Sequence, residues 1–467
     1  MTGNERRTRT EKDSLGEIEV PAEALWGAQT QRALENFPAI APMPGGFVRT
    51  VALIKACAAR VNGELALLDA ERAKAIEAAA MRIIKGEFAD QFPVDRYQTG
   101  SGTSTNMNVN EVIAHLASRD DLPVHPNDHV NLGQSSNDTI PSAIHISVVM
   151  DLYGRLLPVL EQLDRTLARR AEELADVVKP GRTHLMDAMP VTFGQVLGGW
   201  RDQLEFARSR LVQSAEACQE LPQGGTAVGT GINTHPRFAT LFARELSRRT
   251  DVPFTPMATS FAGQGAIDRP VSVSAALRAL ALVLAKIADD LRWMASGPQH
   301  GINEITLPKL QPGSSIMPGK VNPVICESVL MACVQVQGLD QTVALASRGG
   351  HFELNVMLPL LACNLLEMVE LMAAAADKLS TKAVAEFQVN RQSIESGLAA
   401  NPILVTVLNP EVGYSLAAKI AENAYSSGRP VIDVAEEMTD IPRSKLERLL
   451  DPLALTRGGL QNNKQEK

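Results

Sequence analysis

The sequence is poor in aromatic residues, which make up 4% of its 467 positions, whereas 45% of the positions are hydrophobic. Strands favour aromatic and β-branched residues, so a chain rich in Ala and Leu is expected to be helical. The many apolar residues and the small net charge of -8 exclude a disordered chain. The acidic balance argues against a nucleic-acid-binding protein, which normally carries a basic patch.

The chain also lacks a cysteine framework and an obvious membrane segment. Its five cysteines are scattered and form no C-x-x-C pair, so no disulfide scaffold, zinc site or iron–sulfur cluster is expected. The first thirteen residues are polar and contain no apolar signal-peptide core. No run of about eighteen residues is both apolar and free of charge. We therefore expect a cytoplasmic protein with no membrane or nucleic-acid partner.

Long helical patterns fill the middle of the chain. Five sets of apolar residues recur at steps of three and four, which places each set on one helix face. These segments also carry Ala, Gly and Met outside the stripes, which indicates burial on more than one side. We therefore expect a helical bundle shared between the subunits of a homo-oligomer, with a monomeric helical core as the alternative. The sets are Leu152–Leu156–Leu160–Leu163–Leu167–Ala171–Leu174, Leu197–Trp200–Leu204–Ala207–Leu211–Ala215–Cys218, Val273–Leu277–Leu280–Leu284–Ile287–Leu291–Met294, Val329–Cys333–Val336–Val343 and Leu358–Leu361–Leu365–Met368–Met372.

Length and pattern together divide the chain into three lobes of a mainly α protein. Residues 1–134 mix short helical patterns with turn-rich stretches and form an N-terminal lobe, whose loops the resemblance described below implies to be catalytic. Residues 135–391 form the central long-helix bundle, which includes a further polar loop. Residues 392–467 form a small C-terminal lobe.

Four polar segments, punctuated by Gly or Pro, interrupt the helical patterns. Each is followed by a helical pattern, and a helix N-terminus offers unpaired N–H groups and a partial positive charge to an anion. One such segment alone would be an ordinary N-cap. Four that are dense in Gly, Asn and Ser predict a polar site for an anionic ligand. The segments are TGSGTSTNMNVN (99–110), HPNDHVNLGQSSND (125–138), GRTHLMDAMP (181–190) and PGSSIMPGKVNP (312–323).

Motifs for cofactors and metals do not fit these segments. Residues 313–320 look like a Walker A loop, but five residues separate the two glycines, and Val321 stands where Ser or Thr would bind magnesium. No Gly-rich loop has the third glycine of a dinucleotide-binding turn. His125 and His129 are four residues apart, but Pro126 argues against a shared helical face and hence against metal ligation. We therefore predict no cofactor and no metal site.

A pocket with one His, a Ser-rich loop, one Lys and many neutral donors suits proton abstraction next to a carboxylate. Lys320, Asn322 and Asn137 could stabilise the resulting carbanion more strongly than the ground state. A base and an acid on opposite faces of the substrate would complete an elimination. The residues themselves leave the substrate open.

From about Lys12 to the C-terminal lobe, the sequence resembles the class II fumarases of the fumarase/aspartase superfamily. The signature loop of that superfamily is matched by GSSIMPGKVNP at 313–323. Four further motifs match in the same order: TGSGT at 99–103, HPND at 125–128, QSSND at 134–138 and GRTH at 181–184.

The resemblance implies a three-domain subunit with a central five-helix bundle, which joins those of three partners in the twenty-helix core of a homotetramer. It implies reversible, metal-independent hydration of fumarate to (S)-malate, as in the tricarboxylic acid cycle, at sites assembled from three subunits. Ser314 would abstract the C3 proton of malate. Loop N–H groups and Lys320 would stabilise the alkoxide form of Ser314 that this step requires. His184, oriented by Glu327, would handle the departing hydroxyl through a water. The residues expected to bind substrate are Ser101, Gly102, Thr103, Ser135, Ser136, Asn137, Thr183, Ser315, Lys320, Val321 and Asn322.

Aspartate ammonia-lyase, which shares the signature loop, is the main alternative, and a non-enzymatic structural relative is another. His184 stands where an aspartase is expected to have Gln, and Gly319 stands where aspartases tend to have Ala. The first motif is TGSGT, whereas aspartases resemble GGAGT. Intact Ser314, His184 and Lys320 argue against a purely structural protein.

Two departures from the fumarase pattern affect the expected sites. Met186 replaces a Gln that is common after GRTHL. The Arg that many fumarases place before HPND is missing, and the segment before His125 is short. The resemblance places a second dicarboxylate site at His125, Pro126, Asn127 and Asp128, but this departure favours a simple turn and helix cap there just as well.

Overall fold

The computed structural model describes residues 7–37 and 39–459. Helices make up most of this part of the chain, and its strands are short and paired in twos. The prediction of a mainly α protein is therefore confirmed. The chain packs into two compact units. The first unit contains Met1–Pro158, Ala207–Ala281 and Cys333–Ala373, and the second contains Val159–Phe206, Leu282–Ala332 and Ala374–Lys467.

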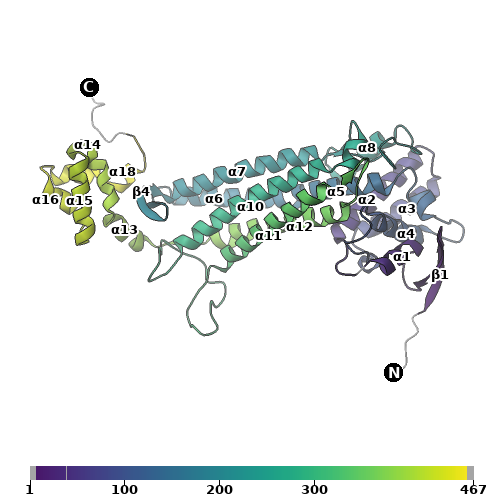
Figure 1. Ribbon diagram of the computed structural model, residues 1–467, viewed down its shortest axis with the longest axis horizontal. Coiled ribbons are helices and arrows are strands. Elements are labelled where there is room, and N and C mark those ends of the chain that lie inside the picture. Colours follow the sequence, from purple (N-terminus) through teal and green to yellow (C-terminus); the bar gives the residue numbers. More distant parts are fainter. Residues whose placement is uncertain (1–6, 38, 460–467) are drawn as a thin grey trace. The chain divides into compact units, whose positions relative to one another are not determined.

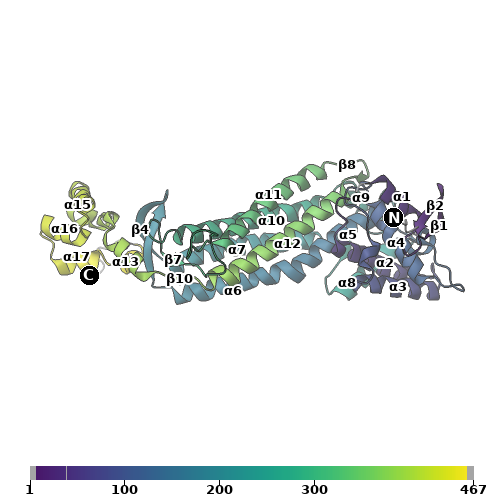
Figure 2. The same ribbon diagram turned by 90° about the horizontal axis from the view of Figure 1, so that it is seen from below.

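The first unit is built around α2 (Gly45–Glu64), a helix that is buried on most of its surface. It packs against α3, α4, α5 and α8 of the same unit (Figure 2). Small residues such as Ala52, Ala56 and Ala59 are fully or almost fully buried, which allows these helices to approach closely. The other elements of this unit are β1 (Thr8–Asp13), β2 (Gly16–Pro21), α1 (Ala28–Asn36), α3 (Ala70–Ile84), η1 (Ala89–Gln91), α4 (Thr103–Ala117), η2 (Pro126–Val130), α5 (Ser136–Asp151), η3 (Leu152–Leu156), β5 (Glu220–Leu221), α8 (Phe238–Thr250), β6 (Thr255–Pro256), α9 (Ser260–Gly265), β8 (Gly350–His351) and β9 (Leu354–Asn355).

Five long helical stretches contribute segments to both units, and within each unit these segments lie side by side (Figure 1). The first stretch is continuous from α5 through the π-helical turn η3 into α6. All five predicted apolar stripes lie on buried faces; in α10, for example, Leu277, Leu280 and Leu284 have no exposed surface. The central five-helix arrangement is thus confirmed. The remaining helices are α6 (Leu157–Glu173), α7 (Phe193–Ala217), α10 (Asp268–Met294), α11 (Val324–Ser347) and α12 (Leu358–Leu379).

Among the described residues, four helical stretches are long and apolar enough to cross a membrane, judged by length and composition alone. Between 39% and 72% of their most apolar windows is buried inside the protein. The absence of a membrane partner therefore stays a prediction. The stretches are Ser136–Glu173, Asp268–Met294, Val324–Ser347 and Leu358–Val384.

The second unit carries an antiparallel hairpin, a small sheet and the C-terminal helices. The hairpin pairs β3 (Val178–Thr183) with β4 (Met186–Thr192), and β7 (Ile305–Thr306) pairs with β10 (Gln388–Val389). The C-terminal helices, labelled in Figure 1, bury their own apolar cluster, which includes Leu408, Ile420 and Leu446. The three predicted lobe boundaries remain a prediction. The elements from 380 onward are η4 (Ser380–Val384), α13 (Arg391–Ala399), η5 (Pro402–Leu408), α14 (Asn409–Val412), α15 (Tyr414–Ser427), α16 (Val431–Met438), α17 (Arg443–Leu449) and α18 (Pro452–Leu455).

Candidate active site

The TGSGT motif forms the turn that starts α4. Gly102 has a φ of 72°, and a Cβ atom there would lie 2.9 Å from Ile140 Cγ2, so both backbone and space favour glycine. The hydroxyl oxygens of Ser101 and Thr103 lie 2.8 Å apart in a hydrogen bond. The helix begins at Thr103, so the polar segment is helical from this residue onward. The motif thus places two hydroxyls at a helix N-terminus, where anions are favoured.

The QSSND motif forms a capping box at the start of α5. Ser135 Oγ accepts from Asn137 N at 3.2 Å, and Asp138 Oδ1 accepts from Ser135 N at 2.9 Å. The other oxygen of Asp138 accepts from the backbone N–H groups of Gly224 and Thr226, both at 3.0 Å. Burial raises the pKa of Asp138, and these N–H groups oppose that rise.

The two motifs lie together in the first unit. Asn106 on α4 donates from Nδ2 to Ser136 Oγ at 3.0 Å. Asn137 donates from Nδ2 to Ala227 O at 2.8 Å. The structure therefore brings two groups of predicted substrate-binding residues, 101–103 and 135–137, to adjacent helix N-termini.

The HPND motif forms a π-helical turn that its own first residue caps. His125 Nδ1 accepts from Asp128 N at 3.2 Å and lies 3.2 Å from Asp128 Oδ2. Pro126 occupies the first position of the turn, and Asn127 is exposed. His129 Nδ1 accepts from His125 N at 2.8 Å. The motif therefore acts as a local cap, and a second dicarboxylate site there stays a prediction.

The GRTH motif lies on the hairpin formed by β3 and β4, whereas the sequence predicts only a polar stretch before a helix. Thr183 pairs with Met186, and His184 and Leu185 form the two-residue turn between them. Their φ angles of 57° and 62° are both positive, as in a type I′ hairpin turn, although neither residue is glycine. His184 is exposed at the tip.

Sequence reasoning missed the group that anchors this hairpin. Glu304 is 2% exposed, and its carboxylate lies 2.9 Å from Lys179 Nζ and 2.5 Å from Arg182 Nη1. Burial lowers the pKa of Lys179, and the Glu304 charge opposes that effect. Arg182 also lies 3.5 Å from the exposed Asp187. The buried ion pairs therefore hold the strand that leads into His184.

The signature loop is closed at its base. Gly313 N donates to Lys320 O at 2.8 Å, and Asn322 Nδ2 donates to Gly313 O at 2.7 Å. Ser314 Oγ accepts from the backbone N–H groups of Ile316 at 3.2 Å and Met317 at 3.0 Å. Ser314, the predicted proton-abstracting residue, thus accepts hydrogen bonds from two backbone N–H groups and lies next to the closed end of the loop.

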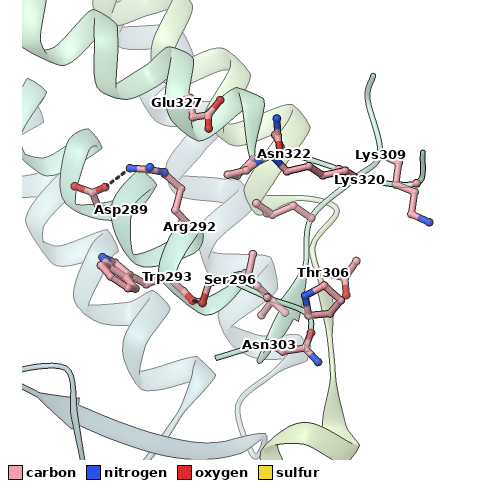
Figure 3. Close-up of a pocket in the computed structure, with 18 residues that line it drawn as sticks. Asp289, Arg292, Trp293, Ser296, Asn303, Thr306, Lys309, Lys320, Asn322 and Glu327 are labelled. Atoms are coloured by element: carbon pink, nitrogen blue, oxygen red, sulfur yellow. Dashed lines mark hydrogen bonds and ion pairs between the residues drawn. The ribbon is translucent and has the colours of Figure 1, made fainter. Parts of the chain in front are cut away.

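The end of this loop lines a cavity of about 800 Å³ in the second unit (Figure 3). Lys320, Val321 and Asn322 contribute to it, and so does Glu327 from the first turn of α11. The opposite wall includes Arg292, which pairs with Asp289 at 3.0 Å. Ser314 and Lys320 both line a neighbouring hollow along the loop. The lining combines cationic and neutral donors with the carboxylates of Asp289 and Glu327, and its donors suit a carboxylate ligand.

His184 lines a different cavity, of about 650 Å³, together with Arg182 and Lys286. Trp293 lines both cavities. Within the described chain, no hydrogen bond or ion pair joins His184 to Glu327. The expected orientation of His184 by Glu327 therefore stays a prediction.

Comparisons with known proteins place this fold and these loops in a class. Residues 16–338 match the lyase family, and residues 404–457 match the family described as the fumarase C C-terminus. The chain is 55% identical to fumarate hydratase class II 2 of Pseudomonas aeruginosa, covering 97% of this chain and 99% of that one. It is 52% identical to fumarate hydratase class II of Xylella fastidiosa, covering 98% of this chain and 97% of that one.

The recombinant class II fumarase from Schistosoma mansoni has the same fold in its crystal structure. Its TM-score is 0.93 at 38% identity, covering 96% of this chain and 99% of that one. The chain is thus a lyase by fold and family, and within the lyases it belongs to the class II fumarate hydratases. The resemblance read from the five motifs is confirmed.

Proposed function

We propose that the chain catalyses the reversible, metal-independent hydration of fumarate to (S)-malate, the hydro-lyase step of the tricarboxylic acid cycle. In a chain of this family, the observation that carries the proposal is the cradle around Ser314 Oγ. Two backbone N–H groups already donate to this oxygen. Such donors favour the charged form of the group they contact, so they would stabilise the alkoxide that a serine base requires.

In the direction from malate to fumarate, the Ser314 alkoxide takes the C3 proton, and the electron pair delocalises into the adjacent carboxylate. Lys320 and Asn322, which both line the cavity at the end of the signature loop, would donate to that developing charge. The C2–O bond then breaks, and His184 supplies a proton through a water so that the hydroxyl leaves as water. Glu327 would orient His184.

The two substrate carboxylates would be held by donors from several loops. Hydroxyl and amide groups at the N-termini of α4 and α5 suit one carboxylate, because unpaired backbone N–H groups lie there. The proposed binding residues are Ser101, Gly102, Thr103, Ser135, Ser136, Asn137, Thr183, Ser315, Lys320, Val321 and Asn322.

The active sites are proposed to be shared between subunits of a homotetramer. Large apolar side chains on the long helices remain exposed in the single chain, including Leu282 on α10 and Met331, Val334 and Leu345 on α11. Exposed apolar area on this scale favours a partner surface. Light scattering should give four chains per particle. A mixture of Ser101→Ala and His184→Asn chains, refolded together, should regain activity that neither variant has alone; a mixture as inactive as its parts would contradict shared sites.

The activity itself is tested by loss of the ultraviolet absorbance of fumarate. Purified protein should consume fumarate without added metal or ammonia and should not release ammonia from aspartate. His184→Asn should lower kcat by about 100-fold or more, as for a general acid. Activity that needs ammonia, or that a chelator abolishes, would overturn the proposal.

A cytoplasmic location without a membrane or nucleic-acid partner completes the proposal. The acidic balance of the chain supports the absence of a nucleic-acid partner. Burial of the apolar helix faces between subunits would account for their composition without a lipid phase. Cell fractionation checks this point, because activity in the membrane pellet would contradict it.

A further inference from the structure

A buried lysine that the reaction does not use lies beneath the carboxylate-binding loops of the first unit. Lys55, on α2, has no exposed surface. Its Nζ donates to Asn131 Oδ1 at 2.8 Å and to Gln134 Oε1 at 3.0 Å, and no carboxylate pairs with it directly in the described chain. Burying a lysine without a direct counter-ion is costly, so a role for this group is expected.

The two acceptors of Lys55 hold the turn that leads into the QSSND motif. Asn131 Nδ2 donates to Gln134 O at 3.1 Å, and Gln134 Nε2 donates to Val130 O at 3.1 Å and to Leu132 O at 3.3 Å. Because each amide turns its oxygen toward Lys55, its nitrogen is directed at backbone carbonyls. Lys55 thereby favours the observed orientation of both amides, and Asn110 Nδ2 supports that of Asn131 by donating to the same oxygen at 3.2 Å.

That orientation passes to the substrate-binding hydroxyl through Asn106 on α4. Asn131 Oδ1 accepts from Asn106 Nδ2 at 3.2 Å, and the same Nδ2 donates to Ser136 Oγ at 3.0 Å. If the Asn106 amide were flipped, its oxygen would face another amide oxygen. The observed orientation leaves Asn106 Oδ1 buried without a hydrogen-bond partner in the described chain, which is energetically unfavourable. Ser136 Oγ therefore accepts from Asn106, which leaves its own hydrogen free to donate elsewhere.

We propose that Lys55 is a positioning residue that, through Asn131 and Asn106, presents Ser136 as a hydrogen-bond donor to a substrate carboxylate. The inference rests on the proposed binding role of Ser136. Each contact along this path from Lys55 to Ser136 pairs a hydrogen-bond donor with an acceptor. Breaking the chain should therefore weaken substrate binding while the distant chemical groups are left in place.

The first test is Lys55→Met, which keeps the stem of the side chain and removes the donor. KM for fumarate should rise about tenfold, the equivalent of one hydrogen bond to a charged ligand, with kcat changed less than threefold. Ile54→Met, on the same helix and equally buried, controls for repacking and should leave KM unchanged. In a Ser136→Ala background, Lys55→Met should raise KM no further, because both changes remove the same interaction.

Asn106→Asp provides a second variant if Lys55→Met is insoluble. It replaces the donor by an acceptor of the same shape, so Ser136 would donate to it and KM should again rise about tenfold. Asn108→Asp on the same helix is the matched control, because Asn108 is 1% exposed and donates instead to Gln91 O.

The inference is overturned if Ser136→Ala raises KM for fumarate but the soluble Lys55 or Asn106 variants have the KM of the wild type. Multiplicative effects of Lys55→Met and Ser136→Ala on KM would overturn it too. An unchanged KM in Ser136→Ala alone would instead remove the proposed binding role of Ser136, and the inference with it. Failure of the proposed function is recognised separately, as absence of fumarate consumption by the wild-type protein.

Discussion

Replacement of Glu304 by Gln tests whether the buried ion pairs hold the hairpin that carries His184. The side chains of Glu304 and Lys179 are 2% and 8% exposed, and that of Arg182 is 20% exposed. Removing one partner of a buried ion pair costs about 3–5 kcal/mol, because the remaining charge stays buried. Arg182 can be partly rehydrated, so we expect the lower end, about 3 kcal/mol.

The same substitution should reduce activity, because His184 lies in the turn that begins two residues after Arg182. A displacement of about 1 Å in a catalytic group can lower the rate by about 100-fold. Urea unfolding at one fixed protein concentration gives the free energy of unfolding, and fumarate absorbance gives kcat. Lys179→Met added to Glu304→Gln should restore part of the stability, since it removes one of the stranded charges.

Asp187→Asn is the matched control, because Asp187 is the other partner of Arg182. Its side chain is 58% exposed and lies 3.5 Å from the guanidinium, so its loss should cost about 0–1 kcal/mol. If Glu304→Gln and Asp187→Asn have the same stability and the same kcat, the buried pairs do not anchor the hairpin and the reasoning is refuted.

Three further predictions concern the first unit. Gly100→Ala should lower the free energy of urea unfolding by about 3 kcal/mol or more, because its Cβ would lie 1.8 Å from Val356 O. Gly154→Ala, where a Cβ would meet no atom within 4 Å, should stay within about 1 kcal/mol of wild type. Equal effects of the two substitutions would contradict the close approach at Gly100. Burial lowers the pKa of Lys55 to about 7, so above that pH the folded state binds fewer protons than the unfolded state. The wild-type stability should therefore gain about 1.4 kcal/mol per pH unit over Lys55→Met between pH of about 7.5 and 9.5, and a constant gap would refute the lowered pKa. Burial raises the pKa of Cys57 to about 12, so a thiol reagent at pH of about 8 should label it only after unfolding, and rapid labelling of the native protein would contradict its burial.

The helical part of the fold could be predicted because apolar periodicity is a local signal. Leu277, Leu280 and Leu284 recur at helical spacing, and all three are fully buried. The start of α5 carries a local signal as well, because Ser135 and Asp138 have the spacing of a capping box and form one in the structure.

The charged groups under the loops could not be predicted in the same way. Glu304 lies outside any periodic segment, and its partners are more than a hundred residues away along the chain. Lys55 did leave a signal, because it occupies a position on the stripe that Val48, Val51 and Ala52 define on α2. A lysine on an apolar stripe is usually explained by a long stem that reaches water, which a single sequence cannot exclude.

The hairpin at 178–192 was missed for another reason. Its turn has neither Gly nor Asn, the residues that normally mark a type I′ turn. Positive φ angles at His184 and Leu185 contradict the local preference and are maintained by the surrounding structure. Strain of this kind has no pattern in the sequence.

Two hydrogen bonds, from Gly313 N to Lys320 O and from Asn322 Nδ2 to Gly313 O, form a clasp at the base of the signature loop. Because Gly313 is tied to both Lys320 and Asn322, the entropy of closing the loop is lost when the protein folds rather than when substrate binds. Ser314 sits next to the clasp, whereas Ile316, 83% exposed, projects from the tip. Substitutions of side chains at the tip should therefore leave the closed base of the loop in place, whereas the position of Ser314 Oγ depends also on the backbone N–H groups of Ile316 and Met317.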